Sequence, residues 1–260
     1  TFTHGPLAEL TQPVERALTL DLPNGLWVAL TDADVDDWCL TKYEVSPTDT
    51  NTLRSVMYSP VDVVTYCATP WKVVMVADAP GRLIEHNDIV LNLNPSCEVP
   101  DAAEWVRPGK IMRANISTEA GLKVIDFCAE HGIPYMLFDW QWYMPCTSPD
   151  GDATQVVDKL DLPRVIAYGK ERGVGVWLYV NQHALMRQSR ELFPLLREWG
   201  VVGVKSGFVQ YASHRWATWL HDLVRLAADN HLMMNIHDEY RPSGFSRTYP
   251  NLLTQEGICG

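Results

Sequence analysis

Residues 232–260 read LMMNIHDEYRPSGFSRTYPNLLTQEGICG, and this stretch contains the same pattern twice. An apolar run at 232–236 ends in His-Asp-Glu at 237–239, and a shorter run at 252–255 ends in Glu256. Apolar runs of this length, closed by polar residues or by a Pro/Gly loop, predict buried parallel strands. In parallel α/β folds the chemistry collects at the carboxyl ends of the strands, so the stretch predicts a functional site.

The acidic residues at these strand ends also have a structural interpretation. Asp or Glu after a strand often caps the next helix or pairs with an arginine, and Arg241 and Arg247 could supply such a partner. The stretch by itself leaves both interpretations open.

Strands and helices alternate through the part of the chain that leads to this stretch. Strands are expected at 111–116, 134–140, 175–181, 201–208, 231–238 and 252–256, and helices at 117–131, 153–172, 185–199 and 214–230. Such alternation with apolar strands indicates a parallel sheet covered on its faces. A closed (β/α)8 barrel needs two strands more, so we expect an α/β fold with an incomplete (β/α)8-type barrel, in a chain that is a piece of a longer protein.

The first part of the chain, residues 1–105, is typical of β structure. Short apolar or alternating runs are separated by turn signals such as Pro-Asn-Gly at 23–25. The expected strands are 17–22, 26–30, 61–67, 72–76 and 89–93. We expect part of a β-sandwich here, and no helix of convincing period.

The composition is that of an acidic globular protein, with 47% hydrophobic residues and a formal net charge of −11. This charge argues against a nucleic-acid partner, because phosphate binding needs clustered Lys and Arg. No apolar run reaches the roughly 18 residues of a membrane span. The six cysteines are scattered without a CxxC pair, which favours buried free thiols over disulfides or zinc.

Three motifs of the chain resemble glycoside hydrolase family 97. They are His-Asp-x-Tyr-Arg-Pro-Ser-Gly at 237–244, Arg-Thr-Tyr-Pro-Asn-Leu at 247–252 and Gln-Glu-Gly at 255–257, and the resemblance extends from about residue 24 to residue 260. It implies a calcium-dependent α-glucosidase or α-galactosidase with a β-supersandwich before a (β/α)8 barrel. We accordingly expect residues 1–105 to be the end of the sandwich and residues 106–260 to be the first part of the barrel.

The resemblance implies a base and a calcium site. In the inverting members a glutamate before Arg-Pro binds calcium and helps to hold the attacking water, and Asp238 is the matching residue here. Glu239 has no matching acid, so either a catalytic role or that of a surface carboxylate is expected. Glu256 matches a family calcium ligand, and Asp32 matches another that the sandwich lends. The implied cofactor is calcium, held by Asp238, Glu256 and Asp32.

Four residues are expected to bind substrate. Lys205 and His237 match substrate-contacting positions of the family, and Asp139 and Gln182 follow two other expected strands. Gln182 stands where the inverting members carry a second base glutamate, and an amide cannot accept a proton at neutral pH.

Gly207 determines the expected stereochemistry. The retaining members carry an aspartate nucleophile after the lysine of a Val-Lys-x-Asp-Phe motif, whereas residues 204–208 here read VKSGF. Glycine cannot attack an anomeric carbon, so the resemblance implies inversion. The general acid is expected past Gly260, so the chain alone is expected to lack it.

The leading expectation is therefore inverting, calcium-assisted hydrolysis of α-glycosidic bonds in gluco-oligosaccharides by the complete protein. A non-catalytic carbohydrate-binding derivative of the fold and an α-galactosidase are the alternatives. The expected partner is an oligosaccharide, and the expected location is the periplasm or the outside of the cell.

Overall fold

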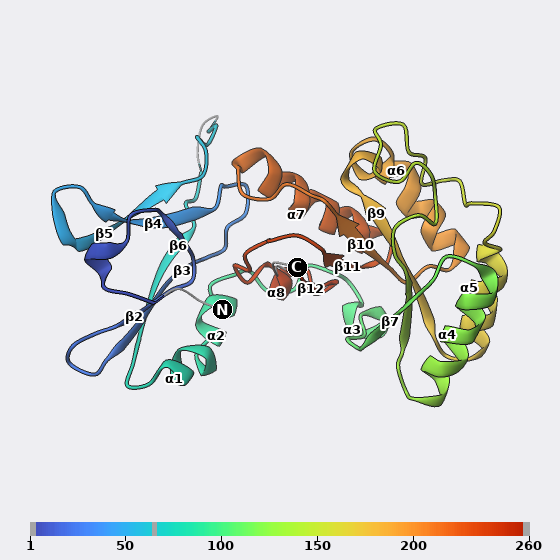
Figure 1. Ribbon diagram of the computed structural model, residues 1–260, viewed down its shortest axis with the longest axis horizontal. Coiled ribbons are helices and arrows are strands. Elements are labelled where there is room, and N and C mark those ends of the chain that lie inside the picture. The colour runs from blue at the N-terminus through green and yellow to red at the C-terminus, as the bar shows by residue number, and fades with distance from the viewer. Residues whose placement is uncertain (1–3, 64–66, 257–260) are drawn as a thin grey trace. The chain divides into compact units, whose positions relative to one another are not determined.

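The computed structural model describes residues 4–63 and 67–256, and the chain divides into two compact units (Figure 1). Unit 1 contains residues 1–97, 210–221 and 241–248, and unit 2 contains residues 98–209, 222–240 and 249–260. Helix α7 (His214–Asp229) begins in unit 1 and ends in unit 2.

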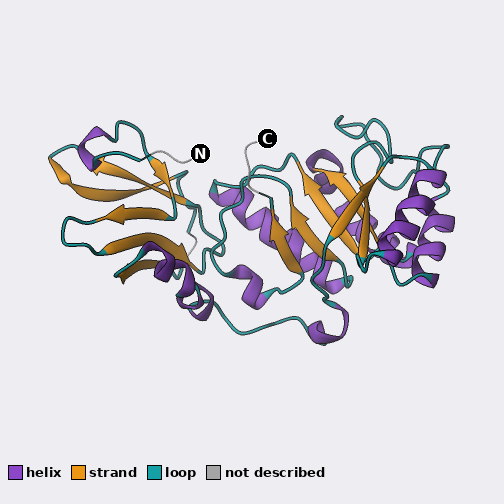
Figure 2. Cartoon of the chain, turned by 60° about the horizontal axis from the view of Figure 1, so that its bottom comes forward, coloured by secondary structure: helices purple, strands orange, loops and turns teal. Residues whose placement is uncertain are grey.

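Unit 2 is built on one sheet of six parallel strands in the order β12-β11-β10-β9-β8-β7. The strands are β7 (Ile111–Ala114), β8 (Tyr135–Phe138), β9 (Gly175–Asn181), β10 (Gly203–Gly207), β11 (Met233–Ile236) and β12 (Leu252–Gln255). They lie side by side as half of a barrel, among the helices of the unit (Figure 2). The predicted α/β class and the predicted incomplete barrel are confirmed.

Three helices that follow strands of unit 2 each begin at a side chain that caps them. The helices are α4 (Thr118–Glu130), α5 (Leu162–Glu171) and α6 (Gln182–Trp199), and the capping side chains are Ser117, Asp161 and Asn181. Each accepts a hydrogen bond from a backbone N–H in the first turn, which would otherwise lack a partner. A short helix, α3 (Ala102–Trp105), precedes β7. No described helix of the chain has the length and apolar character that crossing a membrane requires.

The helix predicted at 153–172 is wrong in its first half. Residues 153–161 form turns and irregular structure, and the helix begins only after Asp161. Pro163 lies in the first turn, where a proline's missing N–H costs nothing, so it marks the start of the helix and not a break within it.

The two faces of this sheet carry different cores because successive side chains of a strand alternate. Tyr135 and Leu137 share one face with Trp177 and Met233, and these four form an apolar cluster. On the other face, Phe138 is fully buried, and a Cβ added at Gly121 of α4 would lie 2.7 Å from its ring. The absence of a side chain at Gly121 therefore sets how closely α4 packs on β8.

Unit 1 contains two antiparallel sheets of three strands each, ordered β1-β4-β5 and β2-β3-β6. The strands are β1 (Val14–Glu15), β2 (Leu18–Asp21), β3 (Trp27–Ala33), β4 (Thr41–Ser46), β5 (Asp49–Met57) and β6 (Trp71–Ala77). A 3-10 turn (Leu7–Glu9) precedes them, and the short helices are α1 (Pro80–Glu85), α2 (Asp88–Asn92) and α8 (Phe245–Thr248). One face of β3 and β6 packs against Leu83 of α1 and Val90 of α2.

Three predictions for residues 1–105 differ from the structure. Residues 89–93 were expected to be a strand, but Asp88–Asn92 is helix α2, and α1 and α3 contradict the expectation that this part holds no helix. A short apolar run does not separate a strand from a buried helical turn, and here Val90 is the residue that turns inward. The strand predicted at 61–67 is not formed at 61–63, and residues 64–66 lie outside the described residues.

The cysteines agree in part with the expectation of buried free thiols. Cys39, Cys128 and Cys146 are buried and free, whereas Cys67 and Cys97 are exposed. Cys259 lies outside the described residues.

Replacing Gly121 with alanine tests the close packing of α4 on β8. Alanine favours helix formation, but its Cβ would lie 2.7 Å from Phe138 and 3.0 Å from Val165. We expect Gly121→Ala to lower the free energy of unfolding by about 1–3 kcal/mol, measured by urea denaturation. Glu130→Ala on exposed helix surface is the matched control, with an expected change within about 0.5 kcal/mol. A stabilised Gly121→Ala variant would contradict the packing argument.

Candidate functional site

The carboxyl ends of four neighbouring strands of unit 2 bring polar side chains to one edge of the sheet. The residues that lie opposite one another across β9, β10, β11 and β12 are Tyr179, Lys205, Asn235 and Thr254. Two residues further along, Gly207 lies opposite Asn181, and the Glu256 N–H donates to the Ile236 carbonyl at 2.8 Å. The parallel register thus gathers residues that are distant in sequence.

Four charged side chains at this edge form what we call the Lys205 cluster. The Lys205 Nζ lies 3.1 Å from a Glu256 carboxylate oxygen and 3.9 Å from Asp139 Oδ2, and the Arg113 Nε lies 3.5 Å from the same Asp139 oxygen. Lys205 and Asp139 are 14% and 19% exposed, so solvent screens their attraction less than that of a surface pair. The structure brings together three predicted site residues, Asp139, Lys205 and Glu256, and adds Arg113.

Arg113 was not predicted as a site residue, because it lies in the first half of the strand expected at 111–116 and the site was expected at the carboxyl ends of the strands. Arg113 lies within β7, two residues after Ile111, and therefore on the same face of the sheet as Ile111. A charged residue inside a predicted buried strand was the available signal.

The Lys205 cluster adjoins a cavity of about 370 Å³ on the face that carries the apolar cluster. Tyr135, Leu137 and Trp177 form apolar walls, and Lys205 and Glu256 contribute charged groups. Apolar walls with a few charged groups are typical of small-molecule sites.

The segment after β11 forms a second group of polar side chains. The His237 N–H donates to the Ser206 carbonyl at 2.9 Å, which ties the segment to β10. Asp238 Oδ2 accepts a hydrogen bond from the Val209 N–H at 2.8 Å, and Asp238 Oδ1 lies 3.7 Å from His237 Nδ1. His237 and Asp238 are 34% and 21% exposed, so both remain accessible to a ligand.

Glu239 and Gln182 occupy different surroundings. Glu239 is exposed in the loop that follows β11. Gln182 is the first residue of α6 and only 8% exposed, and its amide nitrogen lies 3.5 Å from the Met186 sulfur.

Gly207 has no room for a side chain. A Cβ built at this position would overlap the ring of Tyr179 on the neighbouring strand β9. Tyr179 is 1% exposed, and its hydroxyl accepts a hydrogen bond from the Asn181 amide at 3.2 Å. Burial raises the pKa of the Tyr179 phenol, so at neutral pH this group stays protonated. Tyr179 was not predicted as a site residue, although its alternating position in β9 places it on the same face as Trp177.

Asp32 lies in unit 1, where both of its carboxylate oxygens have partners. Oδ1 accepts a hydrogen bond from the Lys72 Nζ at 2.7 Å, and Oδ2 accepts one from the Thr41 hydroxyl. Asp32 is fully buried, so this pair of contacts compensates the cost of burying its charge.

No three His, Cys, Asp or Glu side chains within residues 4–63 and 67–256 are grouped so that they could hold a metal ion. Calcium requires about six to eight oxygen ligands. The expected set of Asp238, Glu256 and Asp32 therefore stays a prediction.

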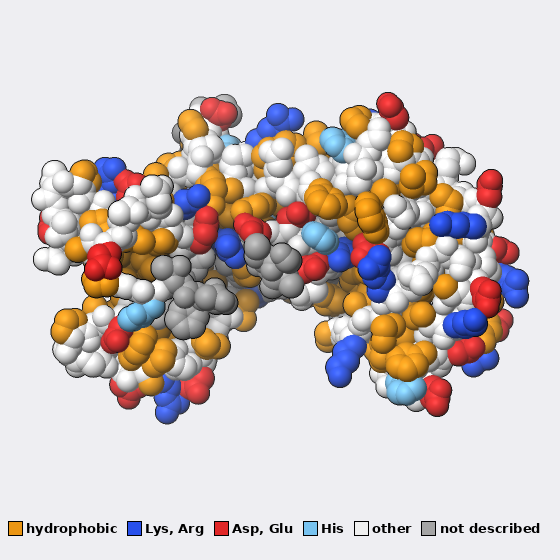
Figure 3. Space-filling view, viewed as in Figure 1, with side chains coloured by type: hydrophobic (Ala, Val, Ile, Leu, Met, Phe, Trp, Pro, Cys, Tyr) orange, Lys and Arg blue, Asp and Glu red, His pale blue; other side chains and the backbone are white. Residues whose placement is uncertain are grey.

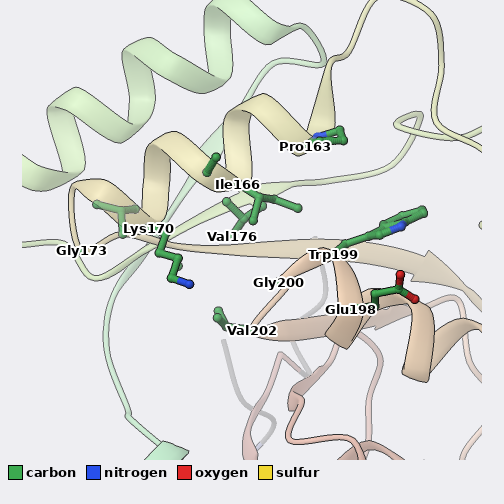
Figure 4. A pocket seen from close by; sticks show the side chains of 12 residues that line it. Pro163, Ile166, Lys170, Gly173, Val176, Glu198, Trp199, Gly200 and Val202 are labelled. Carbon is green, nitrogen blue, oxygen red and sulfur yellow. The ribbon is translucent and has the colours of Figure 1, made fainter.

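A larger cavity of about 800 Å³ lies at the opposite end of the strands, between α5 and the end of α6 (Figure 4). Ile166, Val176 and Val202 line it, with Trp199 on one side and only Lys170 and Glu198 as charged residues. Its distance along the strands from Lys205 and Glu256 separates it from the candidate site.

On the visible face of the molecule, Lys and Arg are interspersed with Asp and Glu (Figure 3).

The chain matches two models of one family. Residues 102–258 match the model described as Glycoside hydrolase 97, and residues 1–95 match Glycosyl-hydrolase 97 N-terminal. Among solved structures, a glycoside hydrolase family 97 enzyme from Pseudoalteromonas sp. strain K8, in complex with acarbose, has a TM-score of 0.85 at 20% identity. That alignment covers 94% of this chain and 44% of the enzyme.

Two curated relatives are described as retaining α-galactosidases. The protein from Streptomyces bingchenggensis, described as probable, is 29% identical over 74% of this chain and 32% of its own length. The protein from Bacteroides thetaiotaomicron is 26% identical over 74% of this chain and 30% of its own length. The chain thus spans about a third of the length of these relatives. The matched models cover most of the chain, and the chain belongs to glycoside hydrolase family 97.

Proposed function

We propose that the complete protein hydrolyses α-glycosidic bonds of oligosaccharides at the carboxyl edge of the unit 2 sheet. The observation that carries this proposal is the Lys205 cluster, in which Lys205 lies within 3.9 Å of two carboxylates from other strands. A partly buried cation and adjoining carboxylates can bind sugar hydroxyls through charge-assisted hydrogen bonds. His237 and Gln182 are proposed as further substrate contacts. The domain boundary near residue 105 and an extracytoplasmic location of the protein are also proposals.

Inversion of configuration is the proposed stereochemistry. A retaining glycosidase needs a carboxylate nucleophile, and position 207 holds a glycine whose side-chain space the Tyr179 ring fills. Asp238 is proposed to orient the attacking water, because one carboxylate oxygen is fixed by the Val209 N–H while Asp238 stays 21% exposed. Glu239 is the second candidate for this role. The general acid is proposed to come from sequence beyond Gly260.

Galactose is proposed as the sugar of the substrate in preference to glucose. Both curated relatives are described as α-galactosidases, and they resemble this chain over 74% of its length. An α-glucoside is the second candidate, because one family member of similar fold was solved with acarbose and, as a variant, with panose. The two curated α-galactosidases are described as retaining enzymes, so Gly207 sets the proposed mechanism apart from theirs.

Calcium is proposed as the cofactor, with Asp238 and Glu256 as ligands, although the described residues do not fit a complete calcium site. The Glu256 carboxylate pairs with Lys205, and one oxygen of Asp238 is held by Val209. Asp32 is proposed as a third ligand, but its oxygens have partners within unit 1. Further ligands would be backbone or amide carbonyls, waters, or carboxylates from outside the described residues.

A non-catalytic carbohydrate-binding protein is the second candidate function. Gln182 favours it, because a buried amide replaces the expected base glutamate and cannot accept a proton. Such a protein would keep the Lys205 cluster and the cavity beside it as a sugar site.

The overlap at Gly207 can be tested by a double-mutant cycle. Gly207→Ala should lower the free energy of unfolding by about 1–3 kcal/mol in urea denaturation, because the new Cβ overlaps the Tyr179 ring. In a Tyr179→Leu background the same change should cost clearly less. Gly81→Ala, which meets no atom within 4 Å, is the control. Equal costs in both backgrounds would show that Tyr179 does not fill this space.

The stereochemistry can be read from the first product formed. The complete protein should release the β-anomer from an α-galactoside or an α-glucoside, detected by proton NMR. Asp238→Asn should lower kcat by at least about 10²-fold, with Glu104→Gln on exposed surface as the control, and a comparable loss in Glu239→Gln would assign the role to Glu239 instead. The 260-residue chain alone should be about 10²–10⁴-fold less active, because the general acid is proposed to lie outside it. An initial α-anomer would refute inversion, and the absence of hydrolysis by the complete protein would favour the carbohydrate-binding protein.

Calcium binding can be tested through thermal stability. Calcium at about 100 times its Kd should stabilise the complete protein by about 2.7 kcal/mol relative to protein treated with EGTA. Asp238→Asn and Glu256→Gln should each weaken this effect, and Glu104→Gln on exposed surface should not. Full stabilisation in both site variants would remove these residues from the ligand set.

A further inference from the structure

Phe208 has a backbone conformation that is unfavourable for its side chain. It follows β10 directly and has φ of 53°, in the left-handed region. Bulky residues rarely adopt this region, and such strain costs of the order of 1–3 kcal/mol. Strained residues cluster at ligand sites, which makes Phe208 a candidate for a functional position.

Two neighbours hold Phe208 in this conformation. The next residue, Val209, is buried and donates its N–H to Asp238 Oδ2 at 2.8 Å. The Phe208 ring stacks on the His237 ring, with centroids 5.6 Å apart and an angle of 27° between the planes. Both contacts come from the segment that follows β11, so the position of the ring is tied to His237 and Asp238.

The Phe208 ring remains 61% exposed although one face is stacked. Burial of a phenylalanine side chain would stabilise the fold by about 1.5–3 kcal/mol, so this ring contributes little to the described core. Strain and exposure together mean that stability alone does not explain the residue. Its place at the carboxyl end of β10, three residues after Lys205, puts it at the candidate site.

We propose that Phe208 is an aromatic platform for the sugar ring, supported from behind by His237. The inference rests on the proposed function and deepens it. The C–H groups on the apolar face of a hexopyranoside carry a partial positive charge, which the negative face of an aromatic ring attracts. In a galactoside the axial hydroxyl at C4 leaves the C–H groups of C3, C4 and C5 on one face. Phe208 therefore favours galactosides over glucosides.

Saturation-transfer NMR on the 260-residue chain tests this platform, with methyl α-galactopyranoside and methyl α-glucopyranoside as probes. Phe208→Ala should weaken galactoside binding by about tenfold, and Phe208→Tyr should keep it within about twofold. The wild-type chain should bind the galactoside more tightly than the glucoside. Because the ring is mostly exposed, Phe208→Ala should leave Tm within a few degrees of wild type.

Phe127→Ala is the matched control. Phe127 is also an exposed phenylalanine stacked on a histidine, His131, but it lies on α4 away from the strand ends. It should leave sugar binding unchanged. Unchanged binding in Phe208→Ala, a parallel loss of Tm and binding, or no binding of either sugar by the wild-type chain would overturn the inference. Hydrolysis by the complete protein would still support the proposed function in those cases, and sugar binding by a complete protein that hydrolyses nothing would overturn the proposed function alone.

Discussion

The candidate site depends on how closely β9 and β10 approach each other at Gly207. The Tyr179 ring occupies the space that any side chain at 207 would need, and this ring is buried and hydrogen bonded to Asn181. Lys205 lies opposite Tyr179 in the register, so the same packing fixes the backbone from which the lysine side chain extends. The absence of a side chain at Gly207 thus allows the two strands to carry Tyr179 and Lys205 side by side.

The charges at this edge are arranged to stabilise one another. Lys205 lies between Asp139 and Glu256, and Arg113 adds a second cation beside Asp139. Lys205 and Asp139 are largely buried, so each depends on a charged partner, whereas Arg113 is 61% exposed and its pairing contributes less. A sugar hydroxyl that enters the cluster can exchange hydrogen bonds with it without leaving a charge uncompensated.

The fold could be predicted further from the sequence than the site could. Parallel strands such as 175–181 were recognisable because they are continuous apolar runs closed by polar residues. The strand predicted at 89–93 failed because five apolar or small polar residues fit a helical turn equally well. The contact of Asp238 with Val209 joins positions 29 residues apart. The lack of space for a side chain at Gly207, which the Tyr179 ring fills, depends on strand register. Neither has a local sequence pattern.

Asp238, which matches a glutamate of the family's inverting members, is held by contacts from two strand ends. Aspartate lacks one methylene relative to glutamate, and an acid on a shorter stem reaches less far into a cavity. Here one oxygen accepts the Val209 N–H and the other lies 3.7 Å from His237 Nδ1, so the carboxylate is oriented by the backbone of one strand end and the side chain of another. Because these contacts fix the orientation of the carboxylate, its accessible side is already oriented toward a ligand. The same hydrogen bond holds the turn that carries Phe208, so it links the position of the acid to that of the aromatic ring.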